Sequence, residues 1–419
     1  MLRDPFIKIG SAKQLRQSDI EQSQESRKRH LAACHRIKGA ARCMCRDDGI
    51  PMGVGLRDQT YYLYTQYKND RQRHAFDCPN RTTGAGKGGH TDSLPVVDVD
   101  EKGININLAS PSYRAAPRQK EEDASPKDKK AGGRGVTRHG QLLSLLEVLC
   151  SQAEINVWRP WFIGKRRYST VRSRLLASTE GMKVNGYPLK PLLYIPPHYV
   201  ESQQAEIQRE FDGFMARLSE DSQRRRFFGY IVGQLRMIEE VKRGSIALKL
   251  KHSRTNLWIS QEKWSRHSTR WFGGLAAKDV QQDHPRLVIA RVERIEGKNG
   301  PWLSLDDIAV MTLADDTSWI PVDSHHERRL ALHLVEAERR FHKPLQVERV
   351  DGELLPDFVL EDREDRCHLE VLGMMSDPNY AARVMEKRDI YAADDQAVWW
   401  WDVEAMPDWP PLPCADRCG

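Results

Sequence analysis

The pattern that decides the C-terminal fold lies in two apolar runs, LLPDFVL at 354–360 and CHLEVL at 367–372. An acidic turn at 361–365 separates them, so the runs predict two adjacent strands. Each run contains one carboxylate, Asp357 in the first and Glu370 in the second. Burying a carboxylate among apolar side chains is costly unless a cation or a donor compensates it. The sequence therefore predicts a partner for both carboxylates, and a divalent metal ion is the natural one.

A helix is expected before this strand pair. Leu330, Leu334 and Phe341 recur at spacings of four and seven, and Glu327 lies one turn ahead of Leu330 on the same face. The pattern therefore aims a third carboxylate inward.

A second helix and a last strand are expected after the pair. Tyr380, Arg383, Lys387 and Tyr391 follow at spacings of three, four and four, which places two cations between two phenols on one helix face. The run VWWW at 398–401 predicts another strand. The expected order is helix, strand, strand, helix, strand.

These residues resemble the PD-(D/E)xK restriction-endonuclease-like superfamily over about the last hundred residues. Asp357 follows Pro356, Glu370 lies in the next apolar strand, and Glu327 matches the acidic residue often found on the first core helix. The lysine expected two positions after the glutamate is Leu372 here. In some members that lysine lies on the following helix, where this chain has Lys387.

The resemblance implies a metal-dependent hydrolysis of phosphodiester bonds. Asp357 and Glu370 would coordinate Mg²⁺ or Mn²⁺, and Glu327 would complete the site. Lys387 would stabilise charge on the phosphorus, and Arg383 would hold a neighbouring phosphate. The alternative from the residues themselves is that Glu370 forms a salt bridge with Arg383 or Lys387 and that no metal binds.

The charge distribution favours a polyanionic partner. The formal net charge is +6, but from residue 320 onward 12 Lys and Arg face 22 Asp and Glu, so the preceding part is strongly basic. Lys165, Arg166 and Arg167 follow the aromatic stretch WRPW at 158–161, a mixture that suits phosphates and stacked bases. A solvated helix face with a few core tryptophans is the other interpretation. DNA is the expected partner.

Four of the eight cysteines crowd the N-terminal part. Because the sequence has no export signal, thiols are expected to stay reduced, which favours metal ligation over disulfides. The preferred structural zinc ligands are Cys34, Cys43, Cys45 and Cys78, with His74 either replacing one of them or lying outside the first shell. Ordinary reduced core thiols remain the alternative.

Composition and pattern predict an α+β multidomain protein in the cytoplasm, with no membrane span. The run of leucines at 142–149 predicts a helix against a core, and β-prone runs after 227 predict a small strand-rich domain. The expected parts are a cysteine-rich zinc-binding region at 1–81, a flexible linker at 82–140, a helical basic and aromatic region at 141–226, the strand-rich domain at 227–320 and the nuclease-like domain at 321–419.

The whole chain also resembles a family of uncharacterised bacterial proteins of integrative and conjugative elements. The cysteine segment, LYIPP at 193–197, HERRL at 326–330 and WWWD at 399–402 carry this resemblance. It implies a mobile-element setting, with DNA and other mobile-element proteins as partners. Two functions are therefore expected: a Mg²⁺-dependent deoxyribonuclease, or a noncatalytic DNA-binding or adaptor protein whose nuclease-like end is degenerate.

Overall fold

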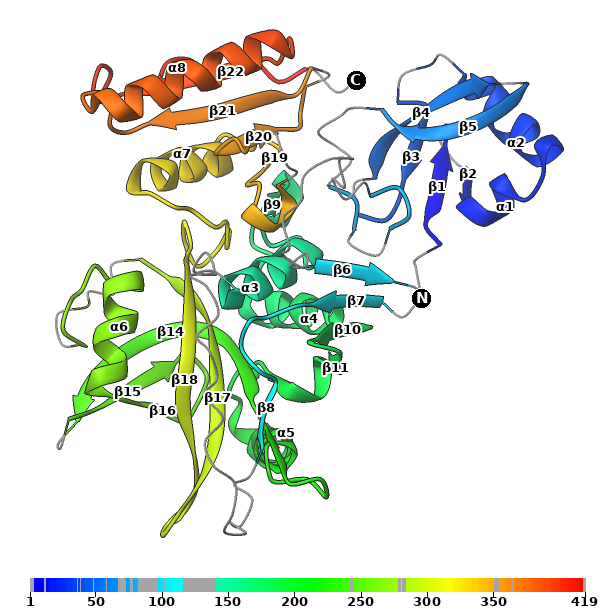
Figure 1. Ribbon diagram of the computed structural model, residues 1–419. Helices are drawn as coiled ribbons and strands as arrows, with labels where there is room; N and C mark the ends of the chain where they lie inside the picture. Colours follow the sequence, from blue (N-terminus) through cyan, green and yellow to red (C-terminus); the bar gives the residue numbers. More distant parts are fainter. Residues whose placement is uncertain are drawn as a thin grey trace, which may run out of the picture. The chain divides into compact units, whose positions relative to one another are not determined.

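The computed structural model describes residues 4–10, 13–35, 37, 39–47, 49–57, 59–66, 73–75, 78–81, 97–100, 103–115, 141–241, 244–277, 280, 284–349, 354–363 and 365–416. These residues form a mixed α+β structure with eight α-helices and five sheets (Figure 1). The chain divides into two compact units. Unit 1 comprises Met1–Ile106, Gly181–Lys183 and Gln346–Leu355, and unit 2 comprises Asn107–Glu180, Val184–Leu345 and Pro356–Gly419.

Unit 1 is built on an antiparallel five-stranded sheet. Its strand order is β2 (Lys13–Arg16), β1 (Phe6–Ile9), β3 (Ala41–Cys43), β4 (Ile50–Arg57) and β5 (Thr60–Thr65). Between β2 and β3 the chain forms α1 (Gln17–Glu21), α2 (Gln24–Leu31) and the short helix η1 (Ala32–Cys34). Ile20 and Leu31 of these helices share one buried core with Ile7, Cys43 and Val54 of the strands. Because strand residues alternate between faces, the other face of this sheet stays outside that core.

Three short strands lie within 82–140, where the sequence predicted a linker. They are β6 (Val97–Asp100), β7 (Gly103–Ile106) and β8 (Tyr113–Ala115), and β6 pairs with β7 as a hairpin. Ile104 and Ile106 are buried, since their alternation gives β7 an apolar face. Residues 82–96, 101–102 and 116–140 of the predicted linker lie outside the described residues. β7 also borders β10 (Met182–Val184), and η7 (Gln346–Glu348) belongs to unit 1.

A closed barrel forms the centre of unit 2. Its strands are β14 (Gly229–Val241), β15 (Ser245–Leu250), β16 (Leu257–Ser260), β18 (Gly300–Thr312) and β17 (Arg286–Gly297), and β17 pairs back with β14. The helix α6 (Gln261–Trp271) connects β16 to β17, and β16 runs parallel to β18. This is the connectivity of a small OB-type barrel. The strands expected after residue 227 are present, and they belong to unit 2 together with the elements before and after them.

Helices and minor strands surround the barrel. The predicted leucine-rich helix is α3 (Gln141–Gln152), which packs on β17 and β18. The other elements of this part are η3 (Pro160–Phe162), α4 (Tyr168–Ser178), β11 (Tyr187–Pro188), η4 (Lys190–Leu192), β12 (Leu193–Tyr194), η5 (Glu201–Gln203), α5 (Gln204–Arg217) and β13 (Arg225–Phe227). β12 pairs with β14, and β13 pairs with β8.

The C-terminal part of unit 2 is a second five-stranded sheet. Its order is β22 (Val398–Asp402), β21 (Cys367–Leu372), β20 (Phe358–Leu360), β19 (Phe341–His342) and β9 (Val157–Trp158). The helix α7 (His325–Glu336) precedes β19, and α8 (Pro378–Ala393) connects β21 to the parallel strand β22. The predicted succession of helix, strand, strand, helix and strand is present, with β19 added before the predicted strand pair. Phe341 lies in β19 and not in the first helix, because the helix ends at Glu336.

None of the described helices combines the length and apolar character needed to cross a membrane.

Candidate functional site

Three cysteines and one histidine of unit 1 meet in a buried cluster. Cys43 ends β3, Cys45 follows in the next turn, and His74 and Cys78 come from the segment after β5. Their ligand atoms all lie within 4.8 Å of one another. Cys43 Sγ is 3.7 Å from Cys78 Sγ, and the Nδ1 atom of His74 is 3.3 Å from Cys45 Sγ and 3.5 Å from Cys78 Sγ. Short-range chain reversals therefore bring four donors to one point.

The groups around the cluster orient its members. The Nε2 atom of His74 is 3.2 Å from the hydroxyl of Thr65, so Nδ1 is the atom directed at the cysteines. Asn80 donates its amide to Cys43 Sγ at 3.5 Å and to Cys78 Sγ at 3.8 Å. A hydrogen-bond partner on the outer ring nitrogen fixes the tautomer that a metal ion requires. The His74 ring is thus held in a ligating orientation.

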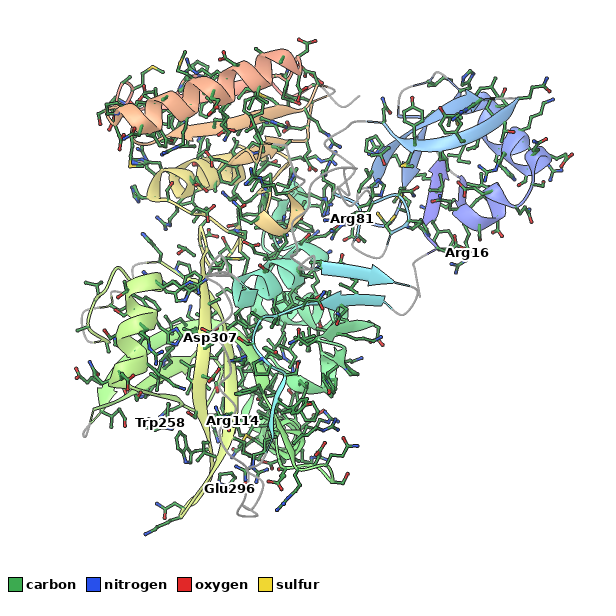
Figure 2. The ribbon with its side chains drawn as sticks, viewed as in Figure 1. Arg16, Arg81, Arg114, Trp258, Glu296 and Asp307 are labelled. Atoms are coloured by element: carbon green, nitrogen blue, oxygen red, sulfur yellow. The ribbon has the colours of Figure 1, made fainter. Side chains whose placement is uncertain are left out.

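One cysteine of the cluster favours the thiolate form. Hydrogen bonds from Cys45 and Cys78 lower the pKa of Cys43 to about 4, so Cys43 is the member that ionises most readily. The same contacts raise the pKa of Cys78. Arg81, labelled in Figure 2, donates to the carbonyl of His74 at 2.8 Å, and burial lowers its pKa to about 10. It remains a cation next to the sulfurs, which stabilises negative charge there.

Three thiols and one imidazole are a ligand set that zinc binds in a closed tetrahedron, so the cluster could hold a zinc ion. The structure differs from the preferred set in one member, because Cys34 is not part of the group. Its thiol points at the carbonyl of Ala40 at 3.8 Å, and burial raises its pKa. His74 takes the fourth place, which was the alternative left open by the sequence.

In unit 2, the carboxylate of Glu327 is paired with a buried lysine. Glu327 lies in the first turn of α7, where Ser324 caps the helix and accepts the Glu327 N–H at 3.0 Å. Lys343 Nζ is 2.7 Å from Glu327 Oε2 and 2.8 Å from Asp323 Oδ2. Burial, together with the charges of Asp357 and Asp323, raises the pKa of Glu327 to about 7 despite the lysine. Glu327 therefore titrates near neutral pH.

Asp357 and Glu370 belong to adjacent strands. Asp357 directly precedes β20, and its Oδ2 accepts the backbone N–H of Val371 at 2.7 Å. Glu370, in the middle of β21, binds Lys387 Nζ of α8 at 2.6 Å through Oε2 and the Tyr391 hydroxyl at 2.6 Å through Oε1. Burial raises the pKa of both carboxyls. The negative charge of Glu370 also raises the pKa of Asp357, and the negative charge of Asp357 raises the pKa of Glu327.

The four residues predicted as catalytic are thus brought to one region of unit 2. Lys343 is a further charged residue in this region, next to Glu327. Burial opposes its charge, but Glu327, Asp323 and Asp357 raise its pKa, so it stays protonated. Sequence reasoning missed this lysine; the signal was a cation inside the short apolar stretch FHKPL at 341–345. We call Glu327, Lys343, Asp357, Glu370 and Lys387 the carboxylate–lysine cluster. Within the described part of the chain, its three carboxylates do not form a group with the close approach of ligand atoms that the cysteine–histidine group has.

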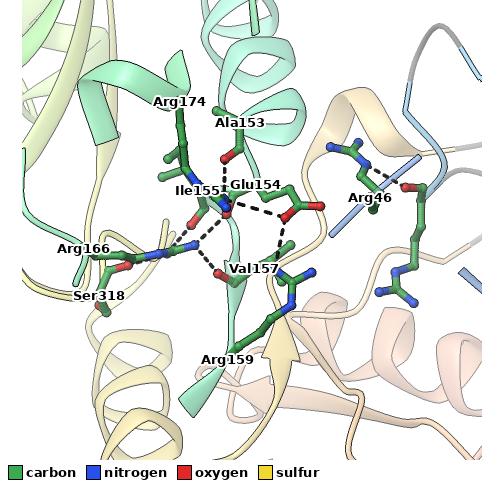
Figure 3. A network of polar contacts seen from close by, with 10 residues as sticks. Arg46, Ala153, Glu154, Ile155, Val157, Arg159, Arg166, Arg174 and Ser318 are labelled. Atoms are coloured by element: carbon green, nitrogen blue, oxygen red, sulfur yellow. Dashed lines mark hydrogen bonds and ion pairs between the residues drawn. The ribbon is translucent and has the colours of Figure 1, made fainter. Parts of the chain in front are cut away.

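Of the four residues predicted to bind phosphates, one is buried and three are exposed. Arg166 is buried, and its guanidinium donates to the carbonyls of Glu154, Ile155, Val157 and Ser318 (Figure 3). All of these bonds are internal, so this side chain has no capacity for a phosphate. Lys165, Arg167 and Arg383 are exposed. Arg159 and Arg174 join the same internal network through Glu154.

These features define a class of protein: an α+β chain of two compact units, one with a candidate metal centre and the other with a buried carboxylate–lysine cluster. The chain belongs to the family described as protein of unknown function DUF1173, whose model matches residues 14–404. Every residue of the two clusters lies inside this match. A search of curated proteins finds no match to the chain.

Proposed function

We propose that the C-terminal part of unit 2 is a metal-dependent phosphodiesterase that cleaves DNA. The observation that carries the proposal is the carboxylate–lysine cluster, in which Glu327 of α7, Asp357 just before β20 and Glu370 of β21 are buried or half-buried. The charge of Asp357 raises the pKa of Glu327, and the charge of Glu370 raises the pKa of Asp357. Strongly perturbed, mutually coupled carboxyls are more frequent at functional sites than elsewhere. The resemblance of the C-terminal residues to restriction-endonuclease-like proteins, and of the whole chain to proteins of mobile elements, suggests DNA as the substrate.

The donor chemistry of the cluster fits Mg²⁺ or Mn²⁺, which prefer carboxylate oxygens. Asp357 accepts the Val371 N–H through Oδ2, and Glu327 contacts Asp323 and Lys343 through Oε2; among the described residues, their second oxygens accept no hydrogen bond. Asp357 and Glu370 would hold the ion, with Glu327 completing the site. When bound, the ion would polarise the scissile phosphate and lower the pKa of an attacking water.

The chain's own residues would perform the remaining tasks. Lys387 reaches Glu370 from α8, and its ammonium supplies the cation that Leu372 does not. A lysine next to a scissile phosphate stabilises the additional negative charge of the transition state. Tyr391 donates to the same carboxylate and fixes its orientation. Arg383, exposed one turn earlier on α8, is placed to contact a neighbouring phosphate.

Cleavage of supercoiled and linear DNA with Mg²⁺ or Mn²⁺ tests this proposal. We expect Asp357→Ala, Glu370→Gln and Lys387→Ala each to reduce the rate by at least about 100-fold, as removal of one electrostatic stabiliser does elsewhere. Asp389→Ala, an exposed carboxylate on the same helix as Lys387, should cleave like the wild type. Cleavage that persists in both carboxylate variants would contradict the assignment.

A specific observation also favours the second function, a noncatalytic DNA-binding or adaptor protein. Both oxygens of Glu370 are already occupied by Lys387 and Tyr391, and Leu372 stands where the superfamily has its lysine. A buried carboxylate whose oxygens are occupied by a lysine and a tyrosine can have a purely structural role, without any catalytic activity. Tight DNA binding with no cleavage in either metal would identify this function.

We further propose that the cysteine–histidine cluster binds one structural zinc ion in a reducing compartment such as the cytoplasm. Cys43, Cys45, His74 and Cys78 would supply all four ligands of such an ion, which would leave no position for a substrate. Metal quantification on purified protein should give about one equivalent of zinc, and Cys43→Ser with Cys45→Ser should abolish it, whereas Cys34→Ser should retain it. Less than half an equivalent in the wild type would contradict this proposal.

A further inference from the structure

We infer that the open face of the unit 1 sheet binds single-stranded nucleic acid. The strand register shows which residues share this face. Lys8 of β1 pairs with Arg42 of β3, which pairs with Pro51 of β4. Farther along β4 on the same face, Gly53 and Gly55 pair with Tyr64 and Tyr62 of β5. The opposite face carries the buried core beneath α1 and α2. We call the open face, which presents Lys8, Arg16, Arg42, Arg57, Tyr62 and Tyr64, the outer face.

Two tyrosines on β5 form an aromatic surface. The Tyr64 ring lies against Gly53 of β4 and the Tyr62 ring against Gly55, so closely that a Cβ at either glycine would overlap the ring. The ring centroids are 6.0 Å apart, and 40% of Tyr62 and 45% of Tyr64 remains exposed. Each ring is therefore supported by backbone on one side and open on the other. Large exposed rings held in this way are suited to base stacking, which every base offers because it has a π-face.

Cations from the other four strands lie on the same face of the sheet as these two tyrosines. Lys8, Arg16, Arg42 and Arg57 come from β1, β2, β3 and β4, and no described strand residue of the outer face is acidic. The guanidinium of Arg16, labelled in Figure 2, lies 4.9 Å from the centre of the half-exposed Phe6 ring. The first 81 residues contain 16 Lys and Arg against nine Asp and Glu, so the surrounding charge has the same sign.

The combination identifies the chemistry of the ligand. Phosphates pair with the cations of the outer face, two of which also have contacts within unit 1: Arg16 lies 3.9 Å from Asp4, and Arg42 donates to the carbonyl of Gly49 at 3.2 Å. Unpaired bases stack on the exposed rings. A duplex offers the phosphates but hides the base faces within its own stack. Single-stranded DNA and single-stranded RNA share both features, and the sheet itself offers no group that separates them. The inference is independent of the proposed hydrolysis, since the outer face and the carboxylate–lysine cluster belong to different units.

The first experiment measures the contribution of the cations. Binding is measured by fluorescence anisotropy with labelled oligothymidylate and oligouridylate of about 20 nucleotides. The parent protein is the full chain with Asp357→Ala, and no divalent metal is added, so that cleavage cannot interfere. Lys8→Gln with Arg57→Gln should weaken binding about tenfold and reduce the salt slope by roughly 1.4, the value for two phosphate contacts on a single strand. Lys28→Gln with Arg29→Gln removes the same charge from α2, away from the outer face, and should change affinity less than about twofold. Equal losses in the two pairs would overturn the inference.

The second experiment measures stacking. Tyr62→Phe with Tyr64→Phe keeps both rings and should bind like the parent, whereas Tyr62→Ala with Tyr64→Ala should weaken binding about 10-fold to 100-fold. A matched duplex should bind more weakly than either single strand and should not respond to the alanine change. Ultraviolet cross-linking of the parent complex should modify the peptide that contains β5. Undiminished binding by the alanine variant, or cross-links only outside unit 1, would overturn the inference; comparison of the two oligonucleotides decides between DNA and RNA.

Discussion

Glu327 is a carboxyl held partly protonated by its surroundings. Burial and two neighbouring carboxylates raise its pKa from the ordinary 4.5 to about 7, although Lys343 lies 2.7 Å away. Between these two pKa values the folded chain retains a proton that the unfolded chain has lost. The contribution of Glu327 to the free energy of unfolding therefore falls as the pH rises through this window.

The corresponding prediction compares Glu327→Gln with the wild type. On going from about pH 5 to about pH 8, the wild type should lose on the order of 2 kcal/mol more of its unfolding free energy than the variant, because only the wild type must ionise a buried carboxyl. Denaturant unfolding at both pH values provides the measurement. Glu336→Gln, exposed near the end of the same helix, is the control and should follow the wild type. A pH-independent difference between wild type and Glu327→Gln would show that the carboxyl does not titrate in this range.

Arg166 illustrates how one basic side chain can serve the fold and not a ligand. Its buried guanidinium joins four carbonyls of the segment around β9 and the loop before α7 (Figure 3). Arg167, the next residue, is exposed. We predict that Arg166→Lys costs about 3 kcal/mol of unfolding free energy, because an ammonium cannot satisfy the same planar set of acceptors. Arg167→Lys should cost less than about 0.5 kcal/mol in the same denaturation assay. Similar small effects for both would contradict the internal role of Arg166.

At the scale of elements, α7 and α8 deliver the charged side chains to the strand carboxylates. α7 starts at a serine cap and presents Glu327, Leu330 and Leu334 to the core. α8 starts at Asp377, whose side chain accepts the N–H groups of Asn379 and Tyr380, and Pro378 occupies the first turn. These caps fix where each helix begins, and so which residue of each turn faces the sheet.

The cap of α7 yields the next prediction. Ser324→Ala should lower the unfolding free energy by about 1 kcal/mol, because the Glu327 N–H loses its acceptor, whereas Ser324→Gly should cost only a few tenths. Thermal denaturation followed by circular dichroism measures both. Because Glu327 sits in the first turn, DNA cleavage should also decline in Ser324→Ala if the proposed activity holds. An alanine variant as stable as the wild type would show that the cap contributes nothing.

Much of the element order was predictable. Apolar patterns indicated α3, α7, the strand pair of Asp357 and Glu370 and four of the five barrel strands, whereas β18 was not predicted. The spacing of two cations and two phenols indicated α8. The strands β6, β7 and β8 were missed inside a segment predicted as linker, since each is only three or four residues long. Such strands form only when a partner strand supplies the hydrogen bonds, and a partner is not visible in a local pattern.

On the scale of the whole molecule, the chain is organised as two compact units with separate hydrophobic cores. The candidate zinc cluster belongs to the core of unit 1, where Cys43, Cys45 and Cys78 are themselves core residues. Unit 2 contains the closed barrel and the C-terminal sheet. Loss of a metal ion should therefore affect the units unequally.

Chelation tests this expectation. In differential scanning calorimetry, a strong zinc chelator should lower one transition by at least about 10 °C, or abolish it, and leave the other within about 2 °C, because a structural zinc site supplies folding free energy only to its own unit. The Cys43→Ser and Cys45→Ser variant should reproduce the chelated trace without chelator. A uniform shift of the whole profile, or no shift, would contradict the location of the metal in unit 1.

The sequence by itself determined which residues are candidates for a functional site: the crowded cysteines, the carboxylates within apolar strands and the lysine on the following helix. It could do so because residue type and short-range spacing are local properties of the chain. Only the tertiary structure decided which donors meet. It replaced Cys34 by His74 in the cysteine cluster, placed Lys343 beside Glu327, buried Arg166, and laid Tyr62 and Tyr64 across Gly55 and Gly53. These contacts depend on strand register and on packing between elements far apart in the chain, and a pairing of that kind leaves no trace in the spacing of either partner alone.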